Sequence, residues 1–385
     1  MAHKFLIPKT VWLGTGALTD AERDICSLGT KALIVTGQSM IRQGHMNRLT
    51  SLLEKNGVQW EVYSGISGEP TDKMIEAGAA QYKNEACNFI IGFGGGSPLD
   101  SAKAIGVLSV VGGKLSELMG KEITCSLPPI AAIPSTAGTG SEVTQFTIIT
   151  DTQTDVKMLL KGSSLVPTVA VIDPTFTSQA GEQVTVASGL DALTHAVEAY
   201  TSKKANEQSD MYALSAVKRI FRSLPLVLQR PSNLEYREQM SIAAFEAGVS
   251  FSNSSVTLVH GMSRPIGALF HVPHGLSNAM LLPACLGYAI DGAYNRFGEL
   301  GRVIGVAGRQ DGNKEAAIRF LSALNDLCLL CHVPTLSEYG IDKNEFAAKT
   351  DKMAEDAMNS GSPSNTIKYI DKEIIAKLYE SLWEK

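Results

Sequence analysis

Histidines and one aspartate are gathered in two short parts of the chain, and these residue types bind transition metals. Three of the seven histidines lie within fifteen positions, at His260, His271 and His274. Upstream, Asp191 and His195 are four residues apart in a strongly helical pattern, so both side chains project from the same helix face. A carboxylate with several imidazoles and no cysteine pair nearby suits iron, zinc, manganese or cobalt. The spacing therefore predicts a metal site.

Each histidine alone also fits an ordinary structural role. His195 could be a plain helix residue and His260 a hydrogen-bonded core residue. The joint pattern is more informative, because His260 falls in a second helical pattern and His274 lies between Pro273 and Gly275, which predicts a fixed turn at a helix end. Four nitrogen and oxygen ligands complete such a site, although catalysis also needs an open coordination position for the substrate.

A glycine loop follows a buried strand predicted over 88–93 and precedes a helix predicted over 98–108. The loop contains three consecutive glycines: Gly94, Gly95 and Gly96. Ser97 suits the N-cap and Pro98 the first helical position, with Asp100 in the first turn. The free N–H groups of that turn face the loop, which predicts a site for the pyrophosphate of a dinucleotide. Because the linear G-x-G-x-x-G pattern is absent, a bare tight turn is the alternative.

A second glycine-rich turn lies at 133–146 and carries three hydroxyl side chains around its glycines. They belong to Thr136, Thr139 and Ser141. Taken alone, this is an ordinary polar loop. Two such loops at strand ends of one domain favour a nucleotide-binding cleft.

Strand and helix patterns alternate in the first half of the chain and give way to helices alone in the second. Strands are predicted at 5–13, 31–36, 58–64, 88–93, 130–135, 146–151, 156–160 and 168–173. Helical patterns after Gly181 are found at 189–202, 206–224, 235–251, 255–269, 296–306, 314–329, 343–356 and 370–383. The alternation predicts βαβ units and a mostly parallel sheet. We expect an α/β dinucleotide-binding domain at 1–178 and an all-helical metal and substrate domain at 179–385, with a cleft between them.

Composition limits the classes of partner. A length of 385 residues favours two domains, and a net charge of −5 without a long basic block argues against nucleic acid. No apolar run reaches the roughly 18 residues of a membrane span and no signal-peptide pattern is visible, so we expect a cytoplasmic protein that binds no membrane. The six scattered cysteines predict no disulfide framework. Cys328 and Cys331 form a CxxC pair that we interpret as two buried apolar side chains.

Four segments of the chain resemble the iron-dependent (group III) alcohol dehydrogenases in their order and spacing. They are GGGSPLDSAKA, IPSTAGTGSEVT, GLDALTHAVEAY and VHGM…PHGLSNAMLLP. That family includes lactaldehyde reductase and 1,3-propanediol dehydrogenase, and the resemblance covers essentially the whole chain. It implies a Rossmann-like N-terminal domain, an all-α C-terminal domain, a homodimer, and a divalent metal in the cleft, usually iron.

The resemblance also implies roles for individual residues. It places the metal ligands on Asp191, His195, His260 and His274, and the cofactor contacts on Gly95, Gly96, Ser97, Asp100, Thr136 and Thr139. Lys157 resembles the lysine that reaches the nicotinamide-side ribose, and Phe146 falls where the family lines the nicotinamide and substrate pocket. The implied reaction is hydride transfer between nicotinamide C4 and the carbon of a short-chain primary alcohol or aldehyde, with the metal polarising the oxygen.

Two positions depart from the family pattern. The histidine that often follows the third metal ligand by four residues is Arg264 here, and His271 is the candidate to replace it in proton relay, with a structural or pocket-lining role as its alternative. A guanidinium suits a carboxylate, sulfonate or phosphonate, so one hypothesis is a short aldehyde or alcohol that carries an anionic group. The alternative is that Arg264 pairs with a nearby acid or with the cofactor diphosphate. Gly37 stands where NAD-preferring members often carry an aspartate, which leaves NADP(H) open, although we expect NAD(H) or mixed use.

Three other functions remain as alternatives at this stage. The first is an oxidoreductase for a neutral 1,3-diol or lactaldehyde. The second is a metal-dependent non-redox lyase on a dehydroquinate-synthase-like fold. The third, from another class, is a regulatory protein that binds metal or nucleotide without turnover. The ligand set also suits Zn²⁺ in place of Fe²⁺.

Overall fold

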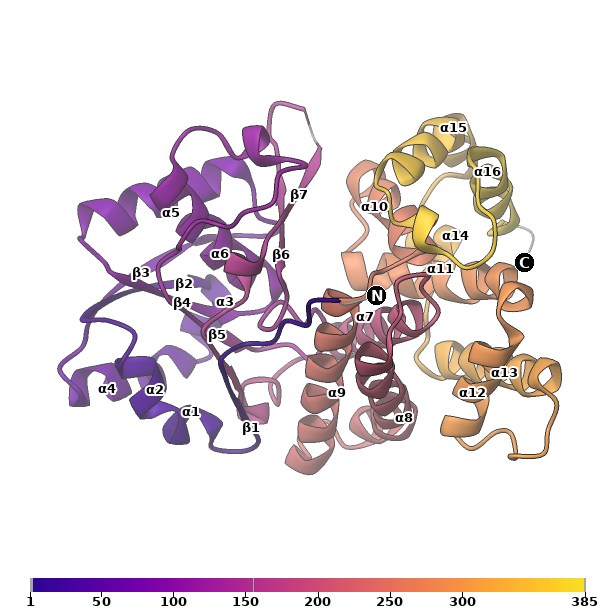
Figure 1. The fold of residues 1–385 in the computed structure, drawn as a ribbon, viewed down its shortest axis with the longest axis horizontal. Helices are drawn as coiled ribbons and strands as arrows, with labels where there is room; N and C mark the ends of the chain where they lie inside the picture. Colours follow the sequence, from indigo (N-terminus) through magenta and orange to yellow (C-terminus); the bar gives the residue numbers. More distant parts are fainter. Residues whose placement is uncertain (1–2, 155, 384–385) are drawn as a thin grey trace. The chain divides into compact units, whose positions relative to one another are not determined.

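A computed structural model of the chain describes residues 3–154 and 156–383. It contains two compact units (Figure 1). The first comprises Met1–Ala180 and Ser232–Ser252, and the second comprises Gly181–Pro231 and Asn253–Lys385. The chain therefore leaves the second unit for one segment and then returns to it.

The first unit is built on a six-stranded parallel sheet with the order β1-β8-β5-β4-β2-β3. Its strands are β1 (Thr10–Leu13), β2 (Lys31–Gly37), β3 (Gln59–Ile66), β4 (Phe89–Gly94), β5 (Ile130–Pro134) and β8 (Val169–Ile172). The central strands are buried along nearly their whole length, as continuous apolar runs predict for a sheet covered on both faces. The predicted parallel α/β architecture is confirmed.

Helices cover both faces of this sheet (Figure 1). One face packs against α1 (Ala17–Asp20), α2 (Glu22–Cys26) and α4 (His45–Lys55), and the other against α5 (Asp72–Asn84) and α6 (Gly96–Val111). The helical segment between β2 and β3 is divided into α3 (Gln38–Arg42) and α4, because Gly44 adopts a left-handed φ of 75° between them. These layers fix the carboxyl ends of β2, β4 and β5, where the predicted phosphate loops begin.

A hairpin and a long helix complete the first unit. The hairpin pairs β6 (Phe146–Thr150) with β7 (Lys157–Lys161) in antiparallel fashion, and the helix is α9 (Leu234–Asn253). Gly140, with a φ of 62°, faces Gly248 of α9 so closely that an added Cβ would lie 2.5 Å from the Gly248 Cα. Gln145 also donates its side-chain amide to the Ser252 carbonyl at 2.7 Å. These contacts explain why α9, far along the chain, belongs to the sheet-containing unit. A single boundary near residue 178 would place α9 in the helical unit instead.

The second unit is helical, and its described residues form no strand. Its α-helices are α7 (Glu182–Tyr200), α8 (Glu207–Gln229), α10 (Leu258–Phe270), α11 (His274–Ala289), α12 (Tyr294–Val303), α13 (Asn313–Leu330), α14 (Leu336–Tyr339), α15 (Lys343–Asn359) and α16 (Lys372–Ser381). Helix α11 was not expected, because Pro273, Gly275 and the internal Pro283 obscure its periodicity. No helix in the described part of the chain has the length and apolar character to cross a bilayer.

Candidate metal and cofactor sites

Three of the predicted metal ligands converge in the helical unit. Asp191 and His195 project from α7, four residues apart, and His260 reaches them from α10. Their ligand atoms all lie within 4.8 Å of one another, and all three side chains are buried. The rings of His195 and His260 are stacked, with centroids 4.5 Å apart.

His274, the fourth predicted ligand, lies at the first residue of α11. Its Nε2 atom is 3.7 Å from Oδ1 of Asp191, and its ring centroid is 5.3 Å from that of His260. The 3.7 Å between Nε2 of His274 and Oδ1 of Asp191 is close to the distance between two ligand atoms of one metal ion, since each metal–ligand bond is about 2.1 Å long. The structure thus brings together all four residues that the sequence singled out.

Close packing of two helices positions His274. Gly275 lies against α7, where an added Cβ would stand 2.4 Å from the carbonyl oxygen of Ala187 and 3.2 Å from Cβ of Asp191. Only a hydrogen atom fits in that space. The glycine therefore allows α11 to approach α7 closely enough for the first residue of α11 to reach the aspartate.

Asn278 is a site residue that the sequence analysis missed. Its Nδ2 donates to Oδ1 of Asp191 at 2.7 Å and lies 3.2 Å from Nε2 of His260 and 3.3 Å from Nε2 of His274. One amide nitrogen therefore faces three ligand atoms that present lone pairs. Its spacing of four residues from His274 on α11 is the signal that could have revealed it.

Glu198 is a second residue that the sequence analysis missed. It follows His195 by three residues on α7 and is fully buried. Its Oε2 contacts Nδ1 of His260 at 2.5 Å. The i, i+3 spacing on a helix that already carries two ligands would have pointed to it.

Burial and neighbouring charges set the protonation states of the side chains in this cluster. Burial lowers the pKa of His260 well below its usual value, and the neighbouring His195 and His274 lower it further. Burial alone would raise the pKa of Asp191, but the three histidines and the Asn278 hydrogen bond hold it below its ordinary value. Near neutral pH the site therefore offers the Asp191 carboxylate and a neutral His260 imidazole beside His195 and His274. Carboxylate and imidazole together form the donor set of a divalent iron or zinc ion.

The two predicted phosphate loops lie side by side at the carboxyl edge of the sheet. Gly94 ends β4 opposite Pro134 of β5, and the Ser135 amide donates to the Gly94 carbonyl at 2.8 Å. A Cβ added to Gly95 would lie 3.4 Å from Cγ2 of Thr136, and one added to Gly96 would lie 2.8 Å from Cγ2 of Thr139. The chain turns outward in opposite directions from β2 and β4 here, which is the place where open parallel sheets bind dinucleotides.

Helix α6 begins earlier than the sequence suggested. Its N-cap is Gly95 and its first residue is Gly96, so Ser97 is the second helical residue rather than the cap, and Pro98 is the third. Asp100 consequently lies beyond the first turn. The free amides at the start of the helix thus belong to the glycines themselves, which lets a phosphate approach without a side chain in the way.

Asp100 and Lys103 connect α6 to the segment that enters β6. Asp100 accepts the Ile148 amide at 3.0 Å and a hydrogen bond from the Ser141 side chain. The fully buried Lys103 ammonium donates to the carbonyls of Thr144 and Phe146 at 2.8 and 2.9 Å. Burial lowers the pKa of Lys103 to about 8. These bonds hold the second loop against the first, so Asp100 and Ser141 have structural partners in addition to their expected cofactor role.

The other predicted cofactor residues lie in the same unit. Gly37 ends β2, beside the start of the glycine loop. Lys157 opens β7 and its ammonium forms an ion pair with Glu69 at 2.8 Å. Phe146 opens β6 and stacks on Phe251 of α9, with centroids 6.4 Å apart and planes at 11°.

Arg264 and His271, the two substrate candidates, both belong to α10 or its end. Arg264 lies one helical turn after His260 and is partly buried, and it donates to the Ser362 hydroxyl at 3.1 Å. Among the residues that the structure describes, no carboxylate lies within ion-pair distance of its guanidinium. His271 ends the helix in a left-handed conformation, with a φ of 54° and an exposed side chain.

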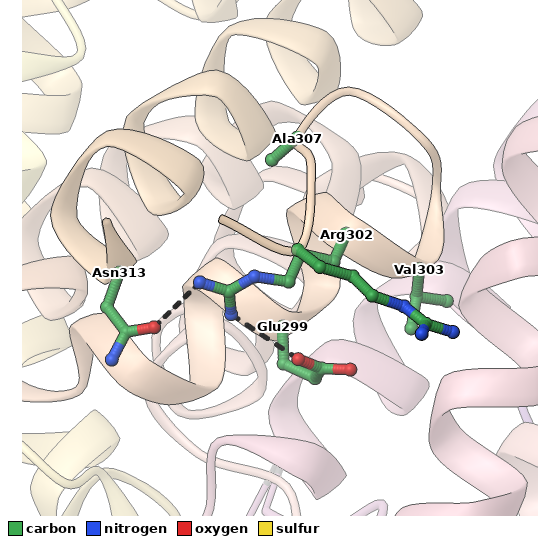
Figure 2. Close-up of a pocket in the computed structure, with 6 residues that line it drawn as sticks. Glu299, Arg302, Val303, Ala307 and Asn313 are labelled. Atoms are coloured by element: carbon green, nitrogen blue, oxygen red, sulfur yellow. Dashed lines mark hydrogen bonds and ion pairs between the residues drawn. The ribbon is translucent and has the colours of Figure 1, made fainter. Parts of the chain in front are cut away.

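A separate hollow of about 600 Å³ opens in the helical unit (Figure 2). It is lined by residues of α12, the following loop and the start of α13: Glu299, Arg302, Val303, Ala307, Arg309 and Asn313. The Arg302 guanidinium is held by Glu299 and by Oδ1 of Asn313. No candidate metal or cofactor residue lines this hollow, so the chemistry is assigned elsewhere.

Comparison with known proteins agrees with this geometry. The profile of iron-containing alcohol dehydrogenases matches residues 8–174, and that of the C-terminal region of the Fe-containing alcohol dehydrogenase family matches residues 185–383. The chain belongs to the iron-containing alcohol dehydrogenase family. It is an oxidoreductase of the alcohol dehydrogenase type, and the resemblance inferred from four sequence segments is confirmed.

Individual members of the iron-containing alcohol dehydrogenase family are similar over nearly the full length. The 1,3-propanediol dehydrogenase of Klebsiella pneumoniae is 34% identical over 379 residues, covering 97% of each chain. A crystal structure of 1,3-propanediol oxidoreductase superposes with a TM-score of 0.96 at 32% identity and covers 100% of both chains. The sulfoacetaldehyde reductase from Bifidobacterium kashiwanohense, in complex with NAD+, gives a TM-score of 0.87 at 26% identity and covers 99% of both.

Proposed function

We propose that this chain reduces short-chain aldehydes to primary alcohols, and catalyses the reverse reaction, with a divalent metal held by Asp191, His195, His260 and His274. The observation that carries the proposal is the convergence of these four side chains in one helical unit, with Asp191, His195 and His260 buried and His274 partly exposed. Iron is the expected metal, and the donor set also suits zinc.

Each part of the chain has a separate task in this reaction. A metal in the site would supply Lewis-acid polarisation of the substrate oxygen. Asp191 contributes the only negative charge among the proposed ligands, and burial lowers the pKa of His260 so that this imidazole is neutral. The glycine loop at 94–97, with Thr136 and Thr139, binds the pyrophosphate of NAD(H) and so orients the nicotinamide that carries the hydride. Phe146 supplies an apolar surface for the nicotinamide side of the pocket.

The cofactor assignment favours NAD(H) without excluding its phosphorylated form. Gly37 puts no carboxylate at the end of β2 to repel a 2′-phosphate, and the neutral Gln38 that follows is bound to the Ser64 hydroxyl at 3.1 Å. Lys157 is proposed to reach the ribose on exchange of its exposed Glu69 partner. A cytoplasmic homodimer is the location and assembly that we propose by analogy with the family.

The test is an anaerobic assay of NADH and NADPH oxidation on protein treated with a chelator and then reloaded. We expect activity with propionaldehyde and glycolaldehyde to disappear after chelation and to return with Fe²⁺, with Zn²⁺ restoring metal content. A metal-dependent lyase would oxidise no reduced nicotinamide with any aldehyde, and a regulatory protein would bind cofactor without turnover. Absence of oxidation in metal-replete protein would therefore overturn the proposal.

Arg264 makes an anionic aldehyde the favoured substrate. Its guanidinium carries five N–H donors, and its one hydrogen bond to protein in the described part of the chain is to Ser362. The Glu198 carboxylate acts on Arg264 from beyond ion-pair distance. The guanidinium of this partly buried cation therefore has donors left for a carboxylate or sulfonate on the substrate. The similarity to a sulfoacetaldehyde reductase supports this class. A neutral 1,3-diol or lactaldehyde, as in the 1,3-propanediol dehydrogenase relative, is the alternative.

Substituting Arg264 by alanine is expected to lower kcat/KM for sulfoacetaldehyde and succinic semialdehyde by about 10- to 100-fold, the value of a charge-assisted hydrogen bond. The loss should be mostly in KM, and kcat/KM for propionaldehyde should change less than about threefold. Arg264→Lys, which keeps the charge but not the planar fork, should recover part of the affinity. Equal losses for the charged and the neutral aldehydes would assign Arg264 a structural role instead.

A further inference from the structure

Glu198 contacts both the start of α10 and a ligand histidine in the interior of the helical unit. The Thr257 hydroxyl and the Val259 amide donate to Oε1 at 2.7 and 2.6 Å, and Nδ1 of His260 lies 2.5 Å from Oε2. Both carboxylate oxygens are therefore used, and the side chain is fully buried.

The contact with His260 determines which ring nitrogen carries hydrogen. A carboxylate only accepts hydrogen bonds, so Nδ1 of a neutral His260 must be the protonated nitrogen. The lone pair is then on Nε2, the atom that lies 3.9 Å from Oδ1 of Asp191 and 3.2 Å from the Asn278 amide. The opposite tautomer would direct an N–H bond at the ligand cluster, and it could not bind a metal.

We propose that Glu198 is the positioning residue of the metal site: it fixes the tautomer and ring orientation of His260 and thereby directs a lone pair to the metal. The inference rests on the metal-dependent function proposed above. Carboxylates bound to the far nitrogen of ligand histidines act in this way at other metal sites, and their loss weakens metal binding by about 10- to 100-fold.

A purely structural role is the competing explanation, because Glu198 also lies at the start of α10. Thr257 is the N-cap of that helix, its own side chain makes no capping bond, and the Val259 amide is one of the free donors of the first turn. The carboxylate thus also serves as a cap. A useful test must separate the capping of α10 from the control of the imidazole.

The substitution Glu198→Gln makes this separation. The Gln oxygen can still accept from Thr257 and Val259, while its amide nitrogen, facing Nδ1 of His260, donates where the carboxylate accepted. That reversal favours the tautomer with hydrogen on Nε2. The complementary substitution Thr257→Val removes a donor at the helix start and leaves the carboxylate on His260.

The experiment measures Zn²⁺ and Fe²⁺ affinity by competition with a chelator, with the Tm of the metal-free protein recorded beside it. For Glu198→Gln we expect the Kd for the metal to rise by about 10- to 100-fold, while the metal-free Tm stays within about 3 °C of wild type. For Thr257→Val we expect a lower metal-free Tm and a Kd within about threefold of wild type. In ¹⁵N spectra of histidine-labelled, metal-free protein, His260 should change from Nδ1–H to Nε2–H in Glu198→Gln alone.

The outcomes distinguish this inference from the proposed function. Wild-type protein that binds neither metal would refute the metal-dependent function itself. Wild-type affinity retained in Glu198→Gln would refute the positioning role and leave Glu198 as a helix cap. A lower Tm accompanied by a higher Kd in both variants would refute it as well.

Discussion

Substituting Asp191 by asparagine is expected to leave the protein nearly free of metal and to lower aldehyde reductase kcat/KM by about a thousandfold or more. Asp191 is the only anionic member of the four proposed ligands, and it is buried, so little water is present to screen its attraction for a divalent cation. Asparagine has almost the same shape. It removes the charge, and the Asn278 amide that donates to Asp191 at 2.7 Å would then face a neutral acceptor.

Metal content by elemental analysis and kcat/KM for the best aldehyde together check this prediction. Glu182→Gln is the matched control, because Glu182 lies at the exposed start of the same helix and has no part in the cluster. The control should retain metal and activity. Wild-type metal content in Asp191→Asn would show that the aspartate is not a ligand, whereas normal metal with lost turnover would assign it to the chemistry alone.

Substituting Gly275 by alanine should impair both the stability of the helical unit and its metal affinity. The added methyl group would lie 2.4 Å from the Ala187 carbonyl oxygen, and backbone cannot rotate away as a side chain can. Helix α11 must therefore move away from α7, and His274, its first residue, moves with it. Overpacking of this kind costs about 2–4 kcal/mol of unfolding free energy, and we expect metal affinity to fall at least about tenfold.

Chemical denaturation of the metal-free protein and metal titration measure the two effects separately. Gly181→Ala provides the control, since Gly181 precedes α7, has an ordinary φ of −63° and has no atom within 4 Å of an added Cβ. Because Gly181 is the N-cap of α7, alanine there should cost no more than about 1 kcal/mol of unfolding free energy, and metal affinity should stay at the wild-type value. A Gly275→Ala protein with normal stability and normal metal affinity would contradict the packing argument.

Sequence alone predicted the features that depend on neighbouring residues along the chain, such as strands and the spacing of residues on one helix face. The strands of the parallel sheet were recognisable as short apolar runs followed by turn residues, and the structure has all of them. Asp191 and His195 could be placed on one face because the helical repeat fixes their relation. The family resemblance then supplied what spacing could not, namely that His260 and His274 join them.

The features that escaped prediction depend on tertiary contacts. Helix α11 was hidden because proline and glycine at its start and a proline inside it lower its propensity, while its packing against α7 offsets that cost. Glu198 and Asn278 look like ordinary helix residues until their neighbours are known. The membership of α9 in the first unit depends on Gly140 meeting Gly248, two glycines more than a hundred residues apart in sequence.

All four proposed ligands come from helices of one unit, and that arrangement bears on the lifetime of the protein in a cell. At a free metal concentration 100 times the Kd, binding would add about 2.7 kcal/mol to the free energy of unfolding of the state that binds the metal. Iron supply would then control how often α7, α10 and α11 open to proteases, whereas the sheet of the first unit gains nothing from it directly. Starvation for iron is expected to shorten the half-life of the protein through cleavage in its C-terminal half, so its abundance would report metal supply without any change in transcription.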